Sequence, residues 1–189
     1  MYLMDHVKFD PFRIEVGGKV LLITEDVVNC VIGLPVGDVD LPDASFAERK
    51  QALADLRRMC ESKGMKQLCI DEGKNFNAIN KTHVPRWIIE RFASMKKSDD
   101  WTIQCFMMLV LHALLFPTTS SNLSGAEWIF CKNLGETKGY NWSKALVSDL
   151  KEKSQKWKKR DIKLAAPAVQ GCVVFLIVSG LLPFFLIFF

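Results

Sequence analysis

An uncharged, strongly apolar C-terminal segment constrains the fold of this chain more than any other feature. No charged residue occurs from Leu164 to Phe189, and fourteen of the eighteen residues from Cys172 onward are Val, Ile, Leu or Phe. As a helix, these eighteen residues would be about 27 Å long, close to the roughly 30 Å hydrocarbon core of a bilayer. Such a segment must be buried, either in the protein core or in lipid.

Two structures are compatible with this segment. In the first, residues 164–189 form a hydrophobic C-terminal helix that crosses a membrane as a tail anchor, and the N-terminal domain stays in the cytosol. The side chains predicted to meet lipid are Cys172, Val173, Val174, Phe175, Leu176, Ile177, Val178, Leu181, Leu182, Phe184, Phe185 and Leu186. In the second, the segment begins as an ordinary core helix near Pro167, and the chain is a truncated product located in the nucleus or cytoplasm.

A short basic segment precedes the apolar one and carries the whole basic character of the chain. Residues 151–163 hold seven Lys or Arg and two acids, whereas the net charge of the entire chain is only +4. The basic side chains are Lys151, Lys153, Lys156, Lys158, Lys159, Arg160 and Lys163. Three interpretations remain open: a solvated helix end, a cytoplasmic flank that orients a membrane span, and a nucleic-acid contact in which Trp157 stacks on a base.

Residues 1–163 predict one small, mainly α-helical domain with a single N-terminal β-hairpin. The hairpin covers about residues 12–23, because two runs of β-forming residues flank Gly17-Gly18, whose backbone adopts the positive φ of a tight turn without strain. Helices are expected at about residues 24–33, 45–62, 85–96, 101–116, 125–134 and 142–157. The residues expected to cap them are Thr24, Ser45 with Glu48, either Ser98 or Asp99, and Asn141.

Apolar spacing indicates which helical faces are buried. The helix at 101–116 is apolar nearly all round, with Gln104 and His112 as interruptions, and it is short for a membrane span, so we expect a central core helix buried on every side. The helices at 45–62 and 142–157 each present one apolar stripe. These stripes are formed by Phe46, Leu53, Leu56, Met59 and Cys60, and by Trp142, Leu146, Leu150, Lys153 and Trp157.

The polar residues form no recognisable active site, so the sequence predicts that the protein is not an enzyme. The six cysteines include no C-x-x-C pair of the kind that begins a zinc site, and we expect reduced thiols packed as small apolar side chains. A cysteine hydrolase would need a histidine beside its thiol. Cys105 and His112 share a helical face, but two turns separate them by about 10 Å, and a core histidine is favoured. No cofactor or metal site is predicted.

Several short stretches occur in an order that resembles a family of transposon-derived plant proteins. They are Val20–Val27, Val31–Gly37, Phe106–Leu109, Leu115–Ser120, Tyr140–Ser143 and Val169–Cys172. Over about residues 12–176 the chain is similar to proteins labelled aminotransferase-like plant mobile domain proteins and to the N-terminal part of SUMO-protease-like transposon proteins. The resemblance implies no catalysis here, because the protease-type relatives carry their catalytic residues in a downstream domain, and no lysine matches a pyridoxal phosphate site.

The sequence therefore favours a non-catalytic, helical domain of a plant transposable-element-derived protein. We expect it to be a truncated product and to act through contacts with a protein partner that the sequence does not identify. The first alternative is a tail-anchored membrane protein that meets the membrane through residues 172–189. A minor alternative is nucleic-acid binding through the basic segment 151–163.

Overall fold

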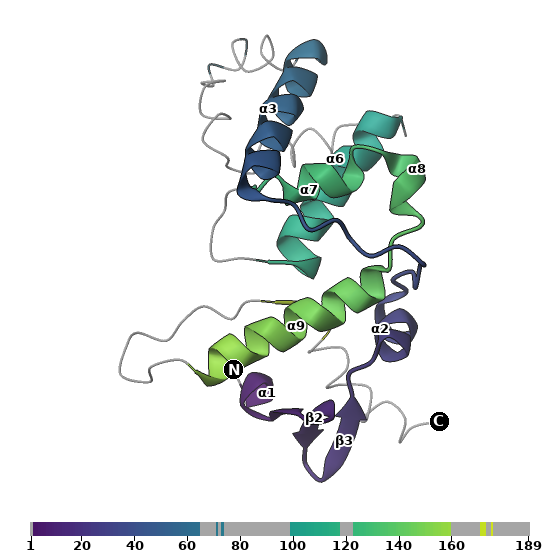
Figure 1. Ribbon diagram of the computed structural model, residues 1–189, viewed down its shortest axis with the longest axis vertical. Coiled ribbons are helices and arrows are strands. Elements are labelled where there is room, and N and C mark those ends of the chain that lie inside the picture. Colours follow the sequence, from purple (N-terminus) through teal and green to yellow (C-terminus); the bar gives the residue numbers. More distant parts are fainter. Residues whose placement is uncertain are drawn as a thin grey trace. The chain divides into compact units, whose positions relative to one another are not determined.

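The computed structural model describes residues 2–64, 71, 73, 99–117, 123–159, 171–172 and 175. The chain divides into two compact units, of which unit 1 consists of residues 1–41, 114–119 and 138–189, and unit 2 of residues 42–113 and 120–137. The prediction of a mainly helical chain with N-terminal β-structure is confirmed (Figure 1). The predicted boundary between residues 163 and 164 lies outside the described residues and stays a prediction.

Unit 1 begins with the short helix α1 (Tyr2–Asp5) and an antiparallel sheet of β1 (Val7–Phe9), β2 (Phe12–Val16) and β3 (Lys19–Leu22) in the order β1-β2-β3. The predicted hairpin is β2–β3, and its Gly17-Gly18 turn has φ values of 57° and 75°. The third strand, β1, was not predicted. Its pairing aligns Val7 with Ile14, and both side chains are buried on one face of the sheet.

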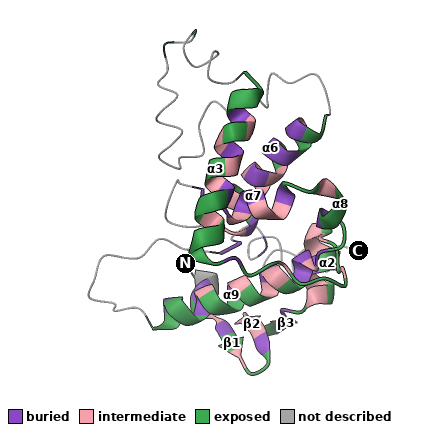
Figure 2. Ribbon diagram, turned by 45° about the horizontal axis from the view of Figure 1, so that its top comes forward, coloured by how far each residue is buried: buried purple, intermediate pink, exposed green. Residues whose placement is uncertain are grey.

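The long helix α9 (Trp142–Lys158) organises the rest of unit 1. Helices α2 (Glu25–Ile32) and α1 both pack against it. The predicted stripe of α9 is confirmed, since Trp142, Leu146, Leu150 and Trp157 are all buried, although Lys153 is partly exposed. Exposed, partly buried and buried positions alternate along this helix (Figure 2). Thr24 and Asn141 accept the expected hydrogen bonds at the helix N-termini, from the backbone N–H groups of residues 27 and 144.

Unit 2 contains α3 (Phe46–Ser62), α6 (Asp100–Val110), α7 (Ala126–Cys131) and α8 (Leu134–Thr137). Helix α7 packs against both α3 and α6. Ser45 and Glu48 form the predicted capping box of α3, and Asp99 caps α6. From α6 the chain continues as a short π-helix, η2 (Leu111–Leu115), so the single helix predicted at 101–116 changes its hydrogen-bonding pattern midway.

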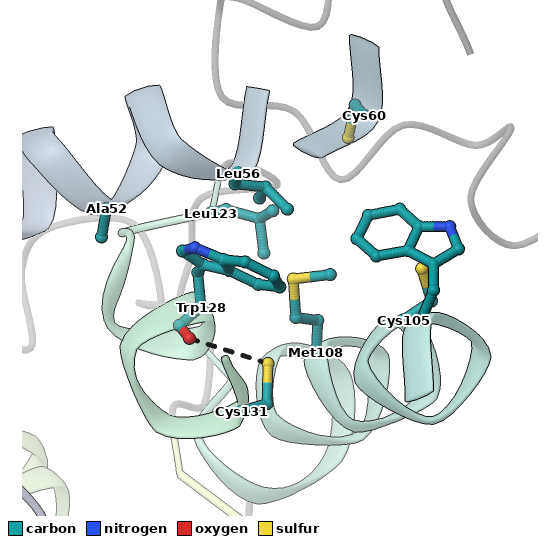
Figure 3. Packing of buried hydrophobic residues seen from close by; sticks show 9 residues of the cluster. Ala52, Leu56, Cys60, Cys105, Met108, Leu123, Trp128 and Cys131 are labelled. Carbon is teal, nitrogen blue, oxygen red and sulfur yellow. Dashed lines mark hydrogen bonds between the residues drawn. The ribbon is translucent and has the colours of Figure 1, made fainter. Parts of the chain in front are cut away.

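One apolar cluster holds α3, α6 and α7 together. The side chains of Leu56, Met108, Leu123 and Trp128 point toward one another (Figure 3), and Trp101 meets Trp128 edge to face with ring centroids 6.3 Å apart. The remaining buried members are Ala52, Cys60, Cys105 and Cys131. Dispersion and burial in this cluster account for the packing of three helices that are far apart in sequence.

Two predictions about buried faces are wrong. Phe46 was expected in the apolar stripe of α3, but it is 84% exposed, because it occupies the first position of the helix, ahead of the turns that face the core. Helix α6 was expected to be buried on every side, but Ile103 and Phe106 are 40% and 48% exposed. The helix therefore buries only the face that carries Trp101, Cys105 and Met108.

Two predicted helices lie wholly or mostly outside the described residues. The helix at 85–96 and the C-terminal helix within residues 164–189 lie outside the described residues, apart from Gly171, Cys172 and Phe175. Among the residues that the structure describes, no helix combines the length and the apolar character needed to cross a membrane.

Candidate functional site

An open groove in unit 2 is the candidate functional site. Its volume is about 880 Å³, within the range of pockets that bind small ligands and peptide segments. One wall is the C-terminal half of α3, with Asp55, Arg58 and Met59. The N-terminal half of α6 contributes Asp100 and Gln104, and the end of α7 contributes Lys132.

Gln104 is the buried polar group of the groove. Only 8% of its surface is exposed, and its Nε2 donates to the Lys132 carbonyl oxygen at 2.9 Å. That bond fixes the orientation of the side-chain amide, because a carbonyl accepts hydrogen bonds and cannot donate one. Gln104 makes no other hydrogen bond within the described part of the chain, so its Oε1 acceptor is available at the groove.

The charged residues of the groove fall into one internal pair and two unpaired groups. The Arg58 guanidinium donates to the Asp55 carboxylate, and Gln51 donates to the same oxygen at 2.9 Å. These bonds from Arg58 and Gln51, followed by the charge of Lys132, lower the pKa of Asp55. Asp100 and Lys132 form no ion pair with the other residues that the structure describes, so one anion and one cation remain open to a ligand.

His112, the histidine weighed as a partner of Cys105, is paired with a carboxylate. The His112 ring lies 3.3 Å, through Nδ1, from Glu127 Oε1, and both side chains are largely buried. Ser124 donates to the other Glu127 oxygen through its backbone N–H at 3.0 Å and its hydroxyl at 2.9 Å. Glu127 therefore joins η2 to the turn before α7. Sequence spacing did not suggest this pair, because its partners are fifteen residues apart on different elements.

The thiols of the unit 2 cluster are poor nucleophiles. Burial raises the pKa of Cys105 to about 12, and burial also raises the pKa of Cys131 to about 12. The Cys131 Sγ points at the Trp128 carbonyl oxygen, 3.9 Å away, in the interior of the cluster (Figure 3). Since the thiolate is the reactive form, both groups fit the predicted role of small apolar side chains. Cys30 is the exception to that prediction, because it is exposed.

No group of three or more metal-binding side chains gathers within the described ranges. The predicted absence of a metal or cofactor is thus not contradicted by these residues, and it stays a prediction for the chain as a whole.

Most described residues of the basic segment already have partners. Lys153 pairs with Asp149 at 3.6 Å, Lys156 pairs with Glu152, and Lys158 donates to the Asp5 carbonyl oxygen at 2.6 Å. Lys151 and Lys159 are exposed, and Arg160 and Lys163 lie outside the described residues. Trp157 is buried, and its Nε1 donates to Asp5 Oδ1 at 2.8 Å, so its ring is not exposed for stacking on a base, and nucleic-acid binding through the basic segment stays a prediction.

Two of the predicted lipid-facing residues are described, and both are buried in the protein. Cys172 and Phe175 each have 0% of their surface exposed, and the Phe175 backbone N–H points at the Cys172 Sγ at 3.4 Å. A side chain added at Gly171 would contact Leu150 and Lys153 of α9 at 3.5 Å. The other predicted lipid-facing residues lie outside the described ones.

Three of the six short stretches that carry the family resemblance, at residues 20–27, 31–37 and 140–143, meet one another in unit 1. Asn141 Nδ2 donates to Glu25 Oε2 at 2.9 Å, and Ser143 Oγ donates to the Leu34 carbonyl oxygen at 2.9 Å. At Gly37 an added Cβ would lie 2.2 Å from the Gly139 carbonyl oxygen, so this close backbone approach requires glycine. These three stretches therefore help to hold the fold of unit 1 together, whereas the stretch at 106–109 and the groove residues belong to unit 2.

The sequence analysis did not identify the groove. Its one local signal was Gln104, which interrupts an otherwise apolar run, and a buried polar residue needs a partner. A comparison with protein families gives a match over residues 1–177 to a domain of unknown function (DUF8566), a range that includes every described residue. That description names no activity. Neither a curated protein nor a solved structure matches the chain.

Proposed function

The chain belongs to the DUF8566 family, and from this premise we propose that it is a non-catalytic domain that acts through contacts with other proteins. The observation that carries the proposal is the groove of unit 2, where the buried Gln104 amide is oriented by its bond to the Lys132 carbonyl and keeps an acceptor available. The Oε1 atom has no hydrogen-bond partner among the described residues and is not a buried atom, so a donor from a partner protein can reach it in place of water.

The chemistry of the neighbouring residues supports binding more than catalysis. A nucleophilic cysteine requires a thiolate, and burial disfavours the thiolate of both Cys105 and Cys131. The His112 imidazole is engaged by Glu127, a carboxylate that also accepts two hydrogen bonds from Ser124. Neither arrangement supplies a base next to a reactive nucleophile.

The charge balance of the groove favours a protein over a nucleic acid. Its two acids, Asp55 and Asp100, offset its two bases, Arg58 and Lys132. Nucleic-acid binding depends on an excess of cations that neutralises phosphates. A protein surface offers both signs of charge together with hydrogen-bond donors, which is what this groove can accept.

We further propose that the chain derives from a plant transposable element. The support is the order of the short stretches that resemble plant mobile domain proteins, and the hydrogen bonds between residues 25 and 141 and between residues 34 and 143 join three of these stretches.

The test is a two-hybrid screen with the full chain, in which every partner found is compared across three baits. The baits are the wild-type chain, Lys132→Glu at the groove, and Lys50→Glu on the exposed face of α3. The two variants make the same change of charge in the same unit, but Lys50 does not line the groove. The proposal requires partners that Lys132→Glu loses and Lys50→Glu keeps. It fails if no partner distinguishes the two variants.

A further inference from the structure

We infer that the groove of unit 2 binds an extended peptide segment that carries one basic and one acidic side chain on either side of an apolar residue of about the size of leucine. The inference rests on the proposed function, because it specifies the part of a partner protein that enters the groove. Four features support it: an acceptor in a fixed orientation, an unpaired cation, an unpaired anion and a partly apolar lining.

The oriented Gln104 acceptor selects a backbone N–H as its ligand. Gln104 is 8% exposed, and its Nε2 is committed to the Lys132 carbonyl oxygen at 2.9 Å, so only Oε1 can meet a ligand. An acceptor held in a fixed orientation favours a donor that is itself fixed in direction. The N–H of an extended peptide has this property, and extended peptides present such donors in regular succession.

The two unpaired charges select opposite charges on the ligand. Asp100 lies in the first turn of α6, and Lys132 follows the last residue of α7. Arg58 offers little to an anion, because Asp55 already accepts its hydrogen bond. A ligand with a carboxylate for Lys132 and a cation for Asp100 therefore matches the groove, whereas a phosphate-rich ligand would meet only one unpaired cation.

The apolar part of the lining can accept an apolar side chain of the ligand. Met59 and Leu134 line the groove and are partly exposed, and Trp128 also lines it with only 4% of its surface exposed. Trp128 is part of the apolar cluster, so the floor of the groove is rigidly supported. A leucine-sized side chain would bury apolar surface against Met59 and Leu134.

The experiment is an NMR titration of the full chain with defined peptides. Two heptapeptides with blocked ends carry leucine at position 4. One has lysine at position 2 and glutamate at position 6, the other has these two in the reverse order, and glycine fills the remaining positions. Two further peptides carry two glutamates or two lysines at those positions. We expect the Gln104 side-chain amide signal to shift with one of the mixed-charge peptides at lower concentration than with either single-charge peptide.

Two further measurements identify the contacts. Replacing the central backbone N–H of the binding peptide by an ester oxygen should weaken its affinity for the wild-type chain about three- to tenfold, since it removes one hydrogen bond without altering the protein. Lys132→Glu should weaken binding about tenfold, and a peptide with lysine in place of its glutamate should recover the loss, whereas Lys50→Glu should have no effect.

Three outcomes would overturn the inference: no shift of the Gln104 signal with either mixed-charge peptide at millimolar concentration, equal binding of the two-glutamate peptide, or equal effects of Lys132→Glu and Lys50→Glu. If the peptides fail while two-hybrid partners still depend on Lys132, the groove contacts proteins by another chemistry and only the peptide class is wrong. If the partners also fail to depend on Lys132, the proposed function is wrong as well.

Discussion

The Asn141 side chain joins two segments of unit 1 that lie 116 positions apart, because its Nδ2 donates to Glu25 Oε2 at 2.9 Å. The same side chain accepts from the Lys144 backbone N–H at 2.8 Å, so it also caps α9. One residue thus starts the longest helix of unit 1 and connects it to the first turn of α2.

The first prediction separates these two roles of Asn141. Asn141→Ala should lower the free energy of unfolding by about 1–2 kcal/mol, because it removes both the cap and the bond to Glu25. Asn141→Ser should lower it by less, since serine keeps a capping oxygen. Urea unfolding measures both values. The matched controls, Glu25→Ala and Asp26→Ala, remove neighbouring acids from the first turn of α2. Both variants lose a favourable interaction with the helix dipole, so only Glu25→Ala should lower the free energy of unfolding by more than that interaction contributes. Equal losses would refute the role assigned to the bond.

The second prediction concerns the reactivity of thiols. Because burial raises the pKa of Cys105 and of Cys131 to about 12, we expect little thiolate at either position below that pH. Iodoacetamide at pH 8 should therefore alkylate the exposed Cys30 well before Cys105 or Cys131 in the folded chain. Peptide mapping by mass spectrometry resolves the three sites, and alkylation in urea serves as the control for intrinsic reactivity. Rapid labelling of Cys105 that depends on His112 would instead revive the cysteine hydrolase hypothesis.

The third prediction concerns acid stability. Asp149 Oδ2 is buried without a hydrogen bond, and loss of solvation raises the pKa of this carboxyl in spite of Lys153 at 3.6 Å. A carboxyl whose pKa is higher in the folded state binds its proton more tightly there. Its contribution to stability is therefore largest at low pH and is lost as the pH rises through the raised pKa.

Asp149→Asn should remove this cost, so it should be neutral or stabilising by up to about 1 kcal/mol at pH 7 and should lose that advantage in acid. Urea unfolding between pH 4 and pH 7 measures the difference. Glu48→Gln, which alters an exposed acid in unit 2, should show the opposite dependence on pH, because hydrogen bonds from Ser45 lower the pKa of Glu48. A loss of several kcal/mol in Asp149→Asn at pH 7 would contradict the prediction.

The fourth prediction decides between the two fates of the apolar segment. Phe175 has no exposed surface in unit 1, so Phe175→Ala should destabilise the chain by about 3–5 kcal/mol. Membrane anchoring, which we retain as a proposal for residues 172–189 on their apolar composition, predicts little effect of Phe175→Ala on the stability of the water-exposed domain.

Carbonate extraction of membranes from cells that express the tagged full chain complements this measurement. An anchored chain stays in the membrane pellet, and a chain whose Phe175 belongs to a core is released. Retention in the pellet together with an unchanged unfolding free energy for Phe175→Ala would contradict the placement of Phe175 in unit 1.

Local sequence signals predicted where the helices start. Strand β1 and the exposure of Phe46 depend on contacts between distant segments, which the sequence could not predict. Thr24, Ser45 and Asn141 each act within one helical turn, so their patterns are sufficient to place the start of α2, α3 and α9. Strand β1 has only three residues, and it depends on its pairing with β2, which no local pattern reveals. Phe46 fits the spacing of a buried stripe but lies at the helix start, where no neighbouring helix covers it.

The groove was beyond sequence analysis for the same reason. The Gln104 amide finds its partner 28 positions away, at a backbone carbonyl that carries no sequence signature. Lys132 and Asp100 appear in the sequence as ordinary surface charges next to helix ends. Only the packing of α7 against α3 and α6 brings these residues to the same groove.

The most direct measurement is site-specific photo-crosslinking of the full chain in cells. A photoreactive phenylalanine analogue placed at Leu134, on the groove, is compared with the same analogue at Phe46, which is 84% exposed and does not line the groove. We predict a discrete protein adduct at position 134 that Lys132→Glu abolishes and Lys50→Glu preserves. The central claim that this domain acts through protein contacts at the groove is contradicted if no adduct forms at position 134. It is also contradicted if the same adducts form at both positions.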